Sequence, residues 1–213
     1  MERNAIILSY EKNPGINLKV LPGHFTTSNS HISHYIDVSS LKSDVAMARE
    51  AAREMALPYL SRIAVDTIVC TEKTEVIGAF LAEELMGGQG VTASEGAGLH
   101  VVTPLYNNLG HLSFQSSMVP HIINKSVILL SAMVSSGRAL DSAIDCISYY
   151  RGKVTGISSI FQAFPERSGL GLHALFTSDD IDGYRLYGPR DCEMCRSGQR
   201  LDALISSEGY TKI

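Results

Sequence analysis

The chain has 213 residues, of which 45% are hydrophobic and 19% charged, a balance that excludes an intrinsically disordered protein. Its net charge of -4 argues against nucleic-acid binding, which usually needs a basic face. No run approaches the roughly 20 apolar residues of a membrane helix. The apolar patch at Ala5–Leu8 is also too short for a secretory signal core. We therefore expect a cytoplasmic protein without nucleic-acid or membrane partners.

The first 40 residues are rich in Ser, Thr, Asn, His and Gly, a composition that favours loops and short strands. Ser43 is expected to cap the N-terminus of a helix, with Asp44 in its first turn. Alanines and methionines recur at helical spacing from Val45 to Leu57, and Pro58 ends the pattern. The first long helix is therefore predicted directly after this N-terminal segment.

Strands and helices then alternate along the chain. This alternation is typical of a parallel sheet covered by helices on both faces, so we predict an α/β fold. Each predicted strand is a short apolar run, and each predicted helix has apolar residues at helical spacing. The predicted strands are Asp66–Cys70, Leu99–Thr103, Val127–Ser131, Val154–Phe161 and Leu172–Phe176, and the predicted helices are Glu75–Met86 and Arg138–Tyr150.

Ligands of parallel sheets bind at the carboxyl ends of the strands. Three loops follow strands here and are therefore of interest: Thr71–Thr74, Pro104–Lys125 and Ala132–Arg138. The last segment, Gly183–Ile213, breaks the alternation and holds several Gly, Pro and charged residues. We expect it to be a tail that wraps on a single domain of residues 1–213.

Four segments of the chain resemble, in order and spacing, those of one protein family. GHFTTSNSHISHYID, at Gly23–Asp37, resembles the N-terminal hood of orotate phosphoribosyltransferases, and VDTIVC with the following helix resembles their strand and pyrophosphate loop. SVILLSAMVSSGRALDSAIDCI resembles their strand, ribose-phosphate loop and helix, and DCEMCRSGQRL a C-terminal CPxC-type element of some members. The resemblance covers most of Leu21–Leu201. It implies a type I phosphoribosyltransferase-like sheet with a hood at about residues 1–40 and a CxxC tail at about 183–213.

The segment Val134–Ala139, between an apolar strand and a helix, is the main candidate for phosphate binding. Gly137 can take a conformation that a side chain would obstruct, and the start of a helix favours an anion. Two serine hydroxyls can donate hydrogen bonds, and Arg138 adds positive charge. From the residues alone, a plain strand-to-helix turn with a Ser cap is the alternative. The resemblance favours phosphate binding by Val134, Ser135, Ser136, Gly137, Arg138 and Ala139.

The chain differs from the family at the positions of the catalytic residues. Family members have two adjacent acids that hold the ribose hydroxyls, and here Ser131 and Ala132 stand there. The only acids expected nearby are Asp141 and Asp145, and they lie a turn or more into the helix. The family's cationic mobile loop corresponds to residues 103–124, which contain no Lys, Arg, Asp or Glu. We therefore assign no catalytic residue, and Mg²⁺ is not expected without a carboxylate pair.

Other candidate ligand contacts are Ser131, Lys73, Thr71 and His111. Lys73 can contact an anion, although the two glutamates beside it would repel a diphosphate, and a plain exposed helix start is the favoured alternative. His111 follows a glycine and can mimic a His-Gly element of the family, whereas an ordinary surface or packed histidine is the alternative. The family's hood lysine is replaced by Ser28.

Cys192 and Cys195 form a CxxC pair, which can bind zinc, form a disulfide or do redox chemistry. Structural thiols or a disulfide are favoured over zinc, because zinc normally takes four ligands and only one such pair is present. His100 and His173 are further candidates as zinc ligands, although no spacing links them to the pair. Thioredoxin-like chemistry needs the pair at a helix start after a strand, which Pro189–Gly198 does not suggest.

The hood contains three histidines that can also ligate a metal: His24, His31 and His34. A polar hood that frames a base, with Tyr35 packed inward, is the favoured alternative. Cys70 and Cys146 lie in apolar runs and are expected to pack as reduced thiols.

The resemblance, together with the differences from the family, leaves two functional hypotheses and a third, weaker one. The first is a non-catalytic sensor or accessory protein that binds a nucleoside monophosphate or a phosphorylated ribose. The alternative is an active phosphoribosyltransferase, a glycosyltransferase of nucleotide metabolism, with an altered substrate, and a third reading is a fold kept for assembly. A homodimer is expected, because family members pair beside their active sites and the uncharged Pro104–Asn124 loop suits burial in a partner.

Overall fold

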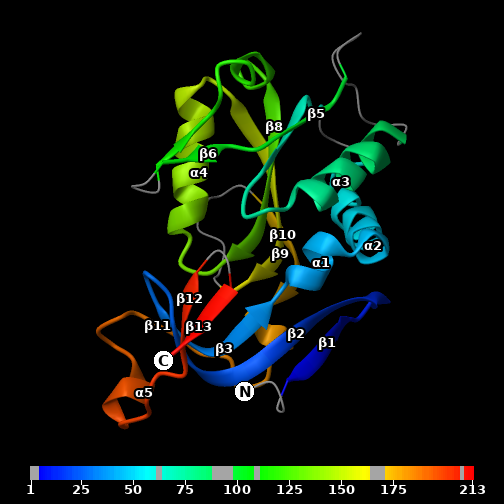
Figure 1. Cartoon of the computed structure of the whole chain (residues 1–213). Coiled ribbons are helices and arrows are strands. Elements are labelled where there is room, and N and C mark those ends of the chain that lie inside the picture. The colour runs from blue at the N-terminus through cyan, green and yellow to red at the C-terminus, as the bar shows by residue number, and fades with distance from the viewer. Residues whose placement is uncertain (1–4, 61–63, 88–97, 108–110, 164–170, 207–208) are drawn as a thin grey trace.

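The computed structural model describes residues 5–60, 64–87, 98–107, 111–163, 171–206 and 209–213. It has two main sheets, and Figure 1 shows the parallel sheet above and a second sheet below it. Within the described residues, no helix is both long enough and apolar enough to cross a membrane.

The upper sheet has five strands in the order β10-β9-β8-β4-β5, and every neighbouring pair is parallel. Each strand lies within three residues of the bounds predicted from its apolar run. The predicted α/β fold with a central parallel sheet is therefore confirmed. The strands are β4 (Thr67–Cys70), β5 (His100–Val102), β8 (Ser126–Val134), β9 (Lys153–Gln162) and β10 (Leu172–Thr177).

Strand β8 contains the continuous apolar run Val127–Leu130 because both of its faces are covered. Ile128 and Leu130 belong to the core cluster that includes the helices on one side of the sheet. Val127 and Leu129 belong to the cluster on the other side, with Ile147 of the opposite helix. Successive side chains of a strand alternate between faces, so a sheet covered on both sides needs a continuous apolar run.

Helices α2 and α3 cover one face of this sheet and α4 covers the other, as Figure 1 shows. Asp44, and not the predicted Ser43, caps α2, since its carboxylate accepts a hydrogen bond from the Met47 amide at 2.9 Å. Ser43 instead ends a preceding short helix, where its hydroxyl donates to the Ser39 carbonyl. The helices are α1 (Ser39–Ser43), α2 (Val45–Ala56), α3 (Glu75–Gly87) and α4 (Arg138–Tyr149).

The lower sheet, here called the hood sheet, has the order β11-β3-β2-β12-β13, with β1 paired to β2. Strand β2 has 14 residues and is longer than the short strands predicted for this segment. A register shift between Pro22 and Phe25 interrupts its pairing with β3, so it is irregular along its length. The strands are β1 (Ile6–Tyr10), β2 (Asn13–Thr26), β3 (His31–Asp37), β11 (Leu186–Tyr187), β12 (Ala203–Ser206) and β13 (Gly209–Lys212).

The tail, residues 183–213, supplies three strands of the hood sheet. Strand β11 pairs with β3, and β12 runs parallel to β2 with Ala203 opposite Phe25. Between them lies a one-turn helix, α5 (Glu193–Arg196). The two end segments of the described chain, blue and red in Figure 1, therefore lie in one sheet.

The uncharged segment after β5 packs on the α4 side of the parallel sheet. It forms a small hairpin, β6 (Leu105–Tyr106) with β7 (Leu112–Ser113), and a 3-10 turn, η2 (Val119–His121). The Phe114 ring packs edge-on against Tyr150 at 5.3 Å between centroids, next to the end of α4. A second 3-10 turn, η3 (Ser178–Asp180), follows β10.

Candidate functional site

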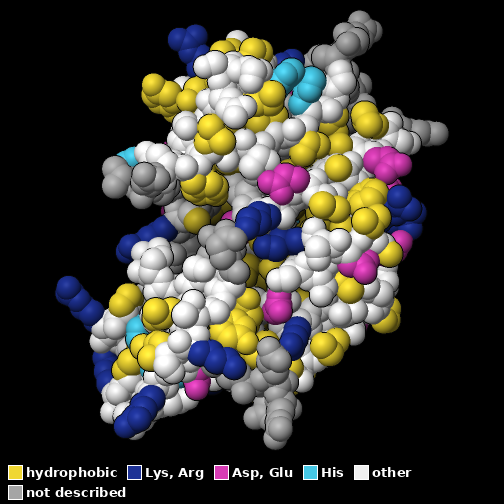
Figure 2. Space-filling view, viewed as in Figure 1, with side chains coloured by type: hydrophobic (Ala, Val, Ile, Leu, Met, Phe, Trp, Pro, Cys, Tyr) yellow, Lys and Arg dark blue, Asp and Glu magenta, His cyan; other side chains and the backbone are white. Residues whose placement is uncertain are grey.

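A cavity of about 560 Å³ lies between the hood sheet and the carboxyl end of the parallel sheet. In Figure 2 the dark blue Lys and Arg side chains near the middle of the face lie between these two halves. Three parts of the chain form its walls: the hood with α1, the loops after β4 and β8, and the tail. The lining residues that carry the argument are Tyr35, Lys42, Glu72, Lys73, the segment 132–137 and Ser206.

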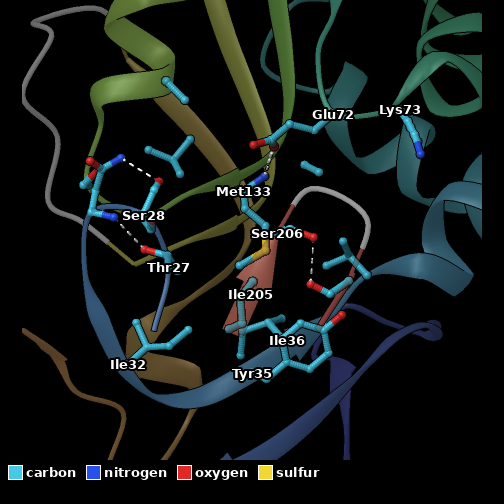
Figure 3. A pocket seen from close by; sticks show the side chains of 18 of the residues that line it. Thr27, Ser28, Ile32, Tyr35, Ile36, Glu72, Lys73, Met133, Ile205 and Ser206 are labelled. Atoms are coloured by element: carbon cyan, nitrogen blue, oxygen red, sulfur yellow. Dashed lines mark hydrogen bonds between the residues drawn. The ribbon is translucent and has the colours of Figure 1, made fainter. Parts of the chain in front are cut away.

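The hood wall combines an apolar surface with a polar turn. Ile32, Tyr35 and Ile36 line the cavity, and Figure 3 shows them below the loops of the parallel sheet. Burial, with smaller contributions from Asp37 and Tyr210, raises the pKa of Tyr35 to about 12, so the phenol is neutral at physiological pH. Tyr35 therefore packs inward as predicted and offers a flat ring and a hydroxyl.

The loop after β8 runs from the strand directly into α4. Gly137 has φ of 78°, a left-handed conformation that glycine adopts without strain, and Arg138 begins the helix. The Gly137 carbonyl accepts the first helical hydrogen bond, from the Asp141 amide at 2.9 Å. The start of this 12-residue helix, with its first-turn amides and favourable dipole, therefore faces the cavity edge.

Most of the six residues predicted to bind phosphate line this cavity. Val134, Ser135, Ser136, Gly137 and Ala139 are among its walls. Arg138 is exposed, and its guanidinium donates a hydrogen bond to the Asn29 side chain at 3.2 Å. This bond ties the loop of the parallel sheet to the hood across the mouth of the cavity.

Glu72 brings a carboxylate to the end of β8. Its Oε2 atom accepts hydrogen bonds from the Ser131 hydroxyl at 3.0 Å and from the Met133 amide at 2.8 Å, as Figure 3 shows for Met133. Glu72 and Lys73 both have positive φ, 56° and 63°, so the chain turns sharply after β4. Figure 3 shows their side chains pointing in different directions from this turn.

The expectation that Asp141 and Asp145 are the only acids near the end of β8 was therefore wrong. That expectation considered acids close in the sequence, and Glu72 is 59 residues from its partner Ser131. Strand β4 lies beside β8 in the sheet, so the loops at their carboxyl ends meet. The strand alternation alone does not reveal which strands are neighbours.

Two lysines share the cavity with this carboxylate. Lys42, in α1, donates from Nζ to the Glu72 carbonyl oxygen at 3.1 Å, and Lys73 lines the same wall. Lys73 is one of the predicted contacts, whereas Lys42 stands in a polar stretch of sequence without a motif and was not predicted. Among the described lining residues, the cavity thus combines one acid with two cations, a balance suited to an anion that also presents hydroxyl groups.

The other predicted ligand contacts lie elsewhere. Ser131 is buried beneath the cavity, and Thr71 is buried with its hydroxyl donating to the Leu130 carbonyl. His111 is exposed, and its backbone amide donates to the Asn107 side chain at 2.9 Å in the β6–β7 hairpin. Of the four candidate contacts, only Lys73 is among the described residues that line the cavity.

The CxxC pair lies against the hood and not near His100 or His173. His100 stacks on His121 at 3.8 Å between centroids, and His173 packs edge-on against Tyr59. Cys192 caps the one-turn helix α5, so the pair does stand at a helix start, contrary to the expectation from Pro189–Gly198. Among the described residues no disulfide is formed.

Two hood histidines meet this pair. His24 and His31 join Cys192 and Cys195 in a group whose ligand atoms all lie within 4.8 Å of one another. This group is called the cysteine–histidine cluster below. The third hood histidine, His34, stacks on the Tyr184 ring at 6.0 Å between centroids. The cysteines and the hood histidines were predicted as separate candidate metal ligands, because nothing in their spacing links residues so far apart.

The fold is that of phosphoribosyltransferases. UMP synthase from Leishmania donovani matches with a TM-score of 0.54 and 19% identity over 74% of this chain, and the chain spans only 33% of its length. Orotate phosphoribosyltransferase from Mycobacterium tuberculosis matches with a TM-score of 0.52 and 13% identity over 78% of this chain and 93% of that one. Adenine phosphoribosyltransferase from Thermoanaerobacter pseudethanolicus matches with a TM-score of 0.51 and 14% identity, covering 83% and 96%.

These structural matches show the arrangement of strands and helices, and the predicted phosphoribosyltransferase-like fold is confirmed. No protein-family model and no curated protein sequence matches the chain.

Proposed function

We propose that this phosphoribosyltransferase-like protein binds a nucleoside monophosphate or a phosphorylated ribose in the cavity and acts as a non-catalytic sensor or accessory protein. One observation carries the proposal. The segment 134–139 contains Gly137 in the left-handed conformation and the first residues of α4. It lies at the cavity wall, at the carboxyl end of a parallel sheet. This is the position at which parallel sheets bind phosphorylated ligands.

The phosphate is proposed to lie against the start of α4. Backbone amides of the first turn and the Ser135 and Ser136 hydroxyls supply donors, and the helix dipole favours the negative charge. Arg138, held by Asn29 at the rim, adds a positive charge nearby. Because the donors are largely main-chain groups, the loop retains affinity for phosphate without the family's catalytic side chains.

The ribose is proposed to lie next to Glu72. One oxygen of this carboxylate is fixed by Ser131 and Met133, and a carboxylate has further lone pairs that can accept a hydroxyl proton. Glu72 thus takes the part of the acidic pair that Ser131 and Ala132 replace in the sequence. A single carboxylate is a poor Mg²⁺ site by itself, so we expect binding without magnesium.

A base is proposed to lie under the hood. Ile32, Tyr35 and Ile36 give a flat apolar wall, and Ile205 of the tail faces the same space in Figure 3. Aromatic and aliphatic surfaces of this kind bind the faces of a base without choosing among bases. The affinity is therefore expected to depend on the phosphate more than on the base.

The proposed lack of catalysis rests on the segment after β5. In orotate phosphoribosyltransferases a cationic loop stabilises the departing pyrophosphate, whereas residues 103–124 here contain no Lys or Arg. The described part of this segment packs beside α4 and contributes no residue to the described cavity lining. Loss of such cations removes several kcal/mol of transition-state stabilisation, which corresponds to a rate loss of orders of magnitude.

The alternative is an active phosphoribosyltransferase with an altered substrate. It is favoured by Lys42, Lys73 and Glu72, which bring charged groups into the cavity. Lys42 and Lys73 would then stand in for the missing cationic loop.

Calorimetry and a turnover assay separate these functions. We expect nucleoside monophosphates and ribose 5-phosphate to bind with or without Mg²⁺, and the unphosphorylated nucleosides to bind at least tenfold more weakly. Phosphoribosyl pyrophosphate with each common base is expected to release no pyrophosphate. Release at about one-hundredth of an ordinary enzyme rate or more would establish the alternative. Equal binding of nucleoside and nucleotide would overturn both.

A further inference from the structure

Two imidazoles of the hood and two thiols of the tail converge outside the cavity. The Nε2 atom of His24 lies 3.1 Å from Nδ1 of His31, 3.4 Å from Sγ of Cys192 and 3.7 Å from Sγ of Cys195. The Sγ atom of Cys195 lies 3.4 Å from Nδ1 of His31. All four atoms lie within 4.8 Å of one another, so they surround a single point.

These separations fit the corners of a tetrahedron around one metal ion. Zinc binds histidine nitrogen at about 2.0–2.1 Å and cysteine sulfur at about 2.3 Å, which puts two nitrogens about 3.3 Å apart and a nitrogen and a sulfur about 3.6 Å apart. The one nitrogen–nitrogen distance is 3.1 Å, and three of the four nitrogen–sulfur distances are 3.4, 3.4 and 3.7 Å. These four distances lie within a few tenths of an ångström of the values for a tetrahedral zinc site.

Groups around His24 hold it in the form that binds metal. Its Nδ1 lies 3.0 Å from the Gln199 carbonyl oxygen, which can only accept a hydrogen bond. Nδ1 therefore carries the proton, and Nε2 keeps its lone pair toward the cluster. The His24 backbone is fixed as well, because its amide donates to the Asp202 carboxylate and its carbonyl accepts from the Asp202 amide, both at 2.8 Å.

The CxxC turn places its two sulfurs on the same side. Cys192 caps α5, and its carbonyl accepts from the Arg196 amide at 3.1 Å. Gly198 has φ of 78° and donates to the Cys195 carbonyl, so the chain reverses after the second cysteine. His24 and Cys192 are buried, whereas Cys195 is exposed, which leaves a path for an ion from solvent.

We propose that His24, His31, Cys192 and Cys195 form a structural zinc site that fastens the tail to the hood. Thiolate and imidazole ligands in a tetrahedral arrangement select zinc, and four protein ligands make a closed site without an open catalytic position. Both cysteines lose their thiol protons to solvent when the ion binds, and both imidazoles bind as neutral rings. The hood supplies one pair of ligands and the tail the other, so the ion joins segments that are distant in the sequence.

The site acts on the cavity through the tail. Strands β12 and β13 follow the CxxC turn, and Ile205, Ser206 and Gly209 line the cavity. Zinc binding would hold these strands in the hood sheet and keep this wall in place. Metal removal is therefore expected to loosen residues 192–213 before the parallel sheet unfolds.

The test is metal analysis of the full chain, purified under reducing conditions without chelator. We expect about one zinc per chain, and after its removal and replacement by Co²⁺ we expect the visible absorption bands of tetrahedral cobalt with thiolate ligands. Cys195→Ser is expected to lower zinc affinity at least tenfold, and His31→Asn likewise. Cys146→Ser, which changes a half-buried thiol outside the cluster, is the matched control and should keep the metal.

Three outcomes would overturn the proposal. One is a reduced, folded protein that binds neither zinc nor cobalt in stoichiometric amount. Another is unchanged zinc affinity in Cys195→Ser. The third is a native protein lighter by two hydrogen atoms with Cys192 and Cys195 joined as a disulfide. Because Cys195 is exposed, its variant is expected to fold, and circular dichroism checks this. The measurements use no nucleotide, so their result is independent of the proposed ligand.

Discussion

The carboxylate of Glu72 accepts a hydrogen bond at 2.8 Å from the backbone amide of Met133, which lies 61 residues later in the chain. The bond crosses from the loop after β4 to the end of β8 and fixes a negative charge at the cavity wall. The carboxylate is thereby positioned before any ligand arrives, so its ordering costs nothing at the moment of binding.

Glu72→Gln tests whether this carboxylate recognises the sugar. The amide keeps the shape but weakens the hydrogen bond to a ribose hydroxyl, since bonds to charged groups contribute about 1.5–3 kcal/mol and neutral ones about 1 kcal/mol. We expect the parent to prefer ribose 5-phosphate over 2-deoxyribose 5-phosphate about tenfold, and the variant to lose most of this preference. Calorimetry with both sugars measures it. Glu50→Gln, on α2, is the control, and an unchanged preference in Glu72→Gln would contradict the assignment.

Gly137→Val tests the phosphate loop. A Cβ at Gly137 meets no atom within 4 Å, so a side chain there causes no steric clash. The substitution costs stability through the backbone, because a φ of 78° is unfavourable by about 1–2 kcal/mol for an L residue. This cost is largest for a β-branched residue. We expect calorimetry to detect no binding of a nucleoside monophosphate to the valine variant. Gly137→Asn is the control, because asparagine tolerates this conformation, and should bind better than the valine variant. Parental affinity in Gly137→Val would disprove the site.

Gly156→Ala is expected to destabilise the parallel sheet. A Cβ there would overlap the ring of Tyr59, which is fully buried and hydrogen-bonded to the Ser158 hydroxyl at 2.8 Å. Overpacking of this kind costs about 1–3 kcal/mol, which chemical denaturation can measure. Gly87→Ala, at the end of α3, has open space around its Cβ and should leave stability within about 1 kcal/mol of the parent. Equal effects of the two substitutions would contradict the packing.

Stability is expected to fall at alkaline pH, in part through Tyr59. Burial raises its pKa from 10.0 to about 12, against a smaller opposite effect of the Ser158 hydrogen bond. The neutral phenol is favoured in the folded state, so its contribution is complete below pH 10 and is lost as the pH rises through 12. The difference between the two pKa values of Tyr59 corresponds to at most about 3 kcal/mol of unfolding free energy.

Denaturation curves from pH 8 to 11 in Tyr59→Phe test this. The variant should be less stable at pH 8, because Ser158 loses its partner, but it should show a smaller loss on raising the pH. Tyr149→Phe removes a hydroxyl from an 82% exposed side chain and serves as the control. A pH dependence in Tyr59→Phe as steep as that of the parent would refute the prediction.

The homodimer expected from the family resemblance stays a prediction. Leu105 and Tyr106 are 47% and 55% exposed on β6, within the uncharged segment proposed to bury against a partner. Sedimentation should give about twice the 23.1 kDa chain mass, and Leu105→Asp should raise the dissociation constant by tenfold or more. Leu57→Asp, equally exposed after α2, should leave the dimer intact. A monomeric parent at micromolar concentration would rule the dimer out.

The parallel sheet could be predicted closely because its strands are buried on both faces. Runs such as Val127–Leu130 are uniformly apolar for that reason, and the glycines at 87 and 137 bound their helices. The residue that caps α2 could not be predicted from the sequence. Ser43 and Asp44 are both good helix caps, and the choice depends on the short helix that ends at Ser43.

The pairings between distant segments could not be predicted. The position of Glu72 depends on β4 lying beside β8, and the cysteine–histidine cluster depends on β12 running along β2. Neither pairing leaves a periodic signal, because both are decided by how separate elements pack. The same limit explains why Lys42 was missed, since a lysine in a polar helix looks like any solvated side chain.

The use of the tail in the cavity wall has a consequence for the order of events during synthesis. All strands of the parallel sheet precede residue 178, so they can leave the ribosome and begin to pack while the tail is still inside the exit tunnel. The hood at that stage lacks β11, β12 and β13 and exposes the edge of β2 that later pairs with β12. A nascent chain in which the sheet forms first would have an incomplete cavity, and its unpaired strand edge would be open to chaperones or to another chain.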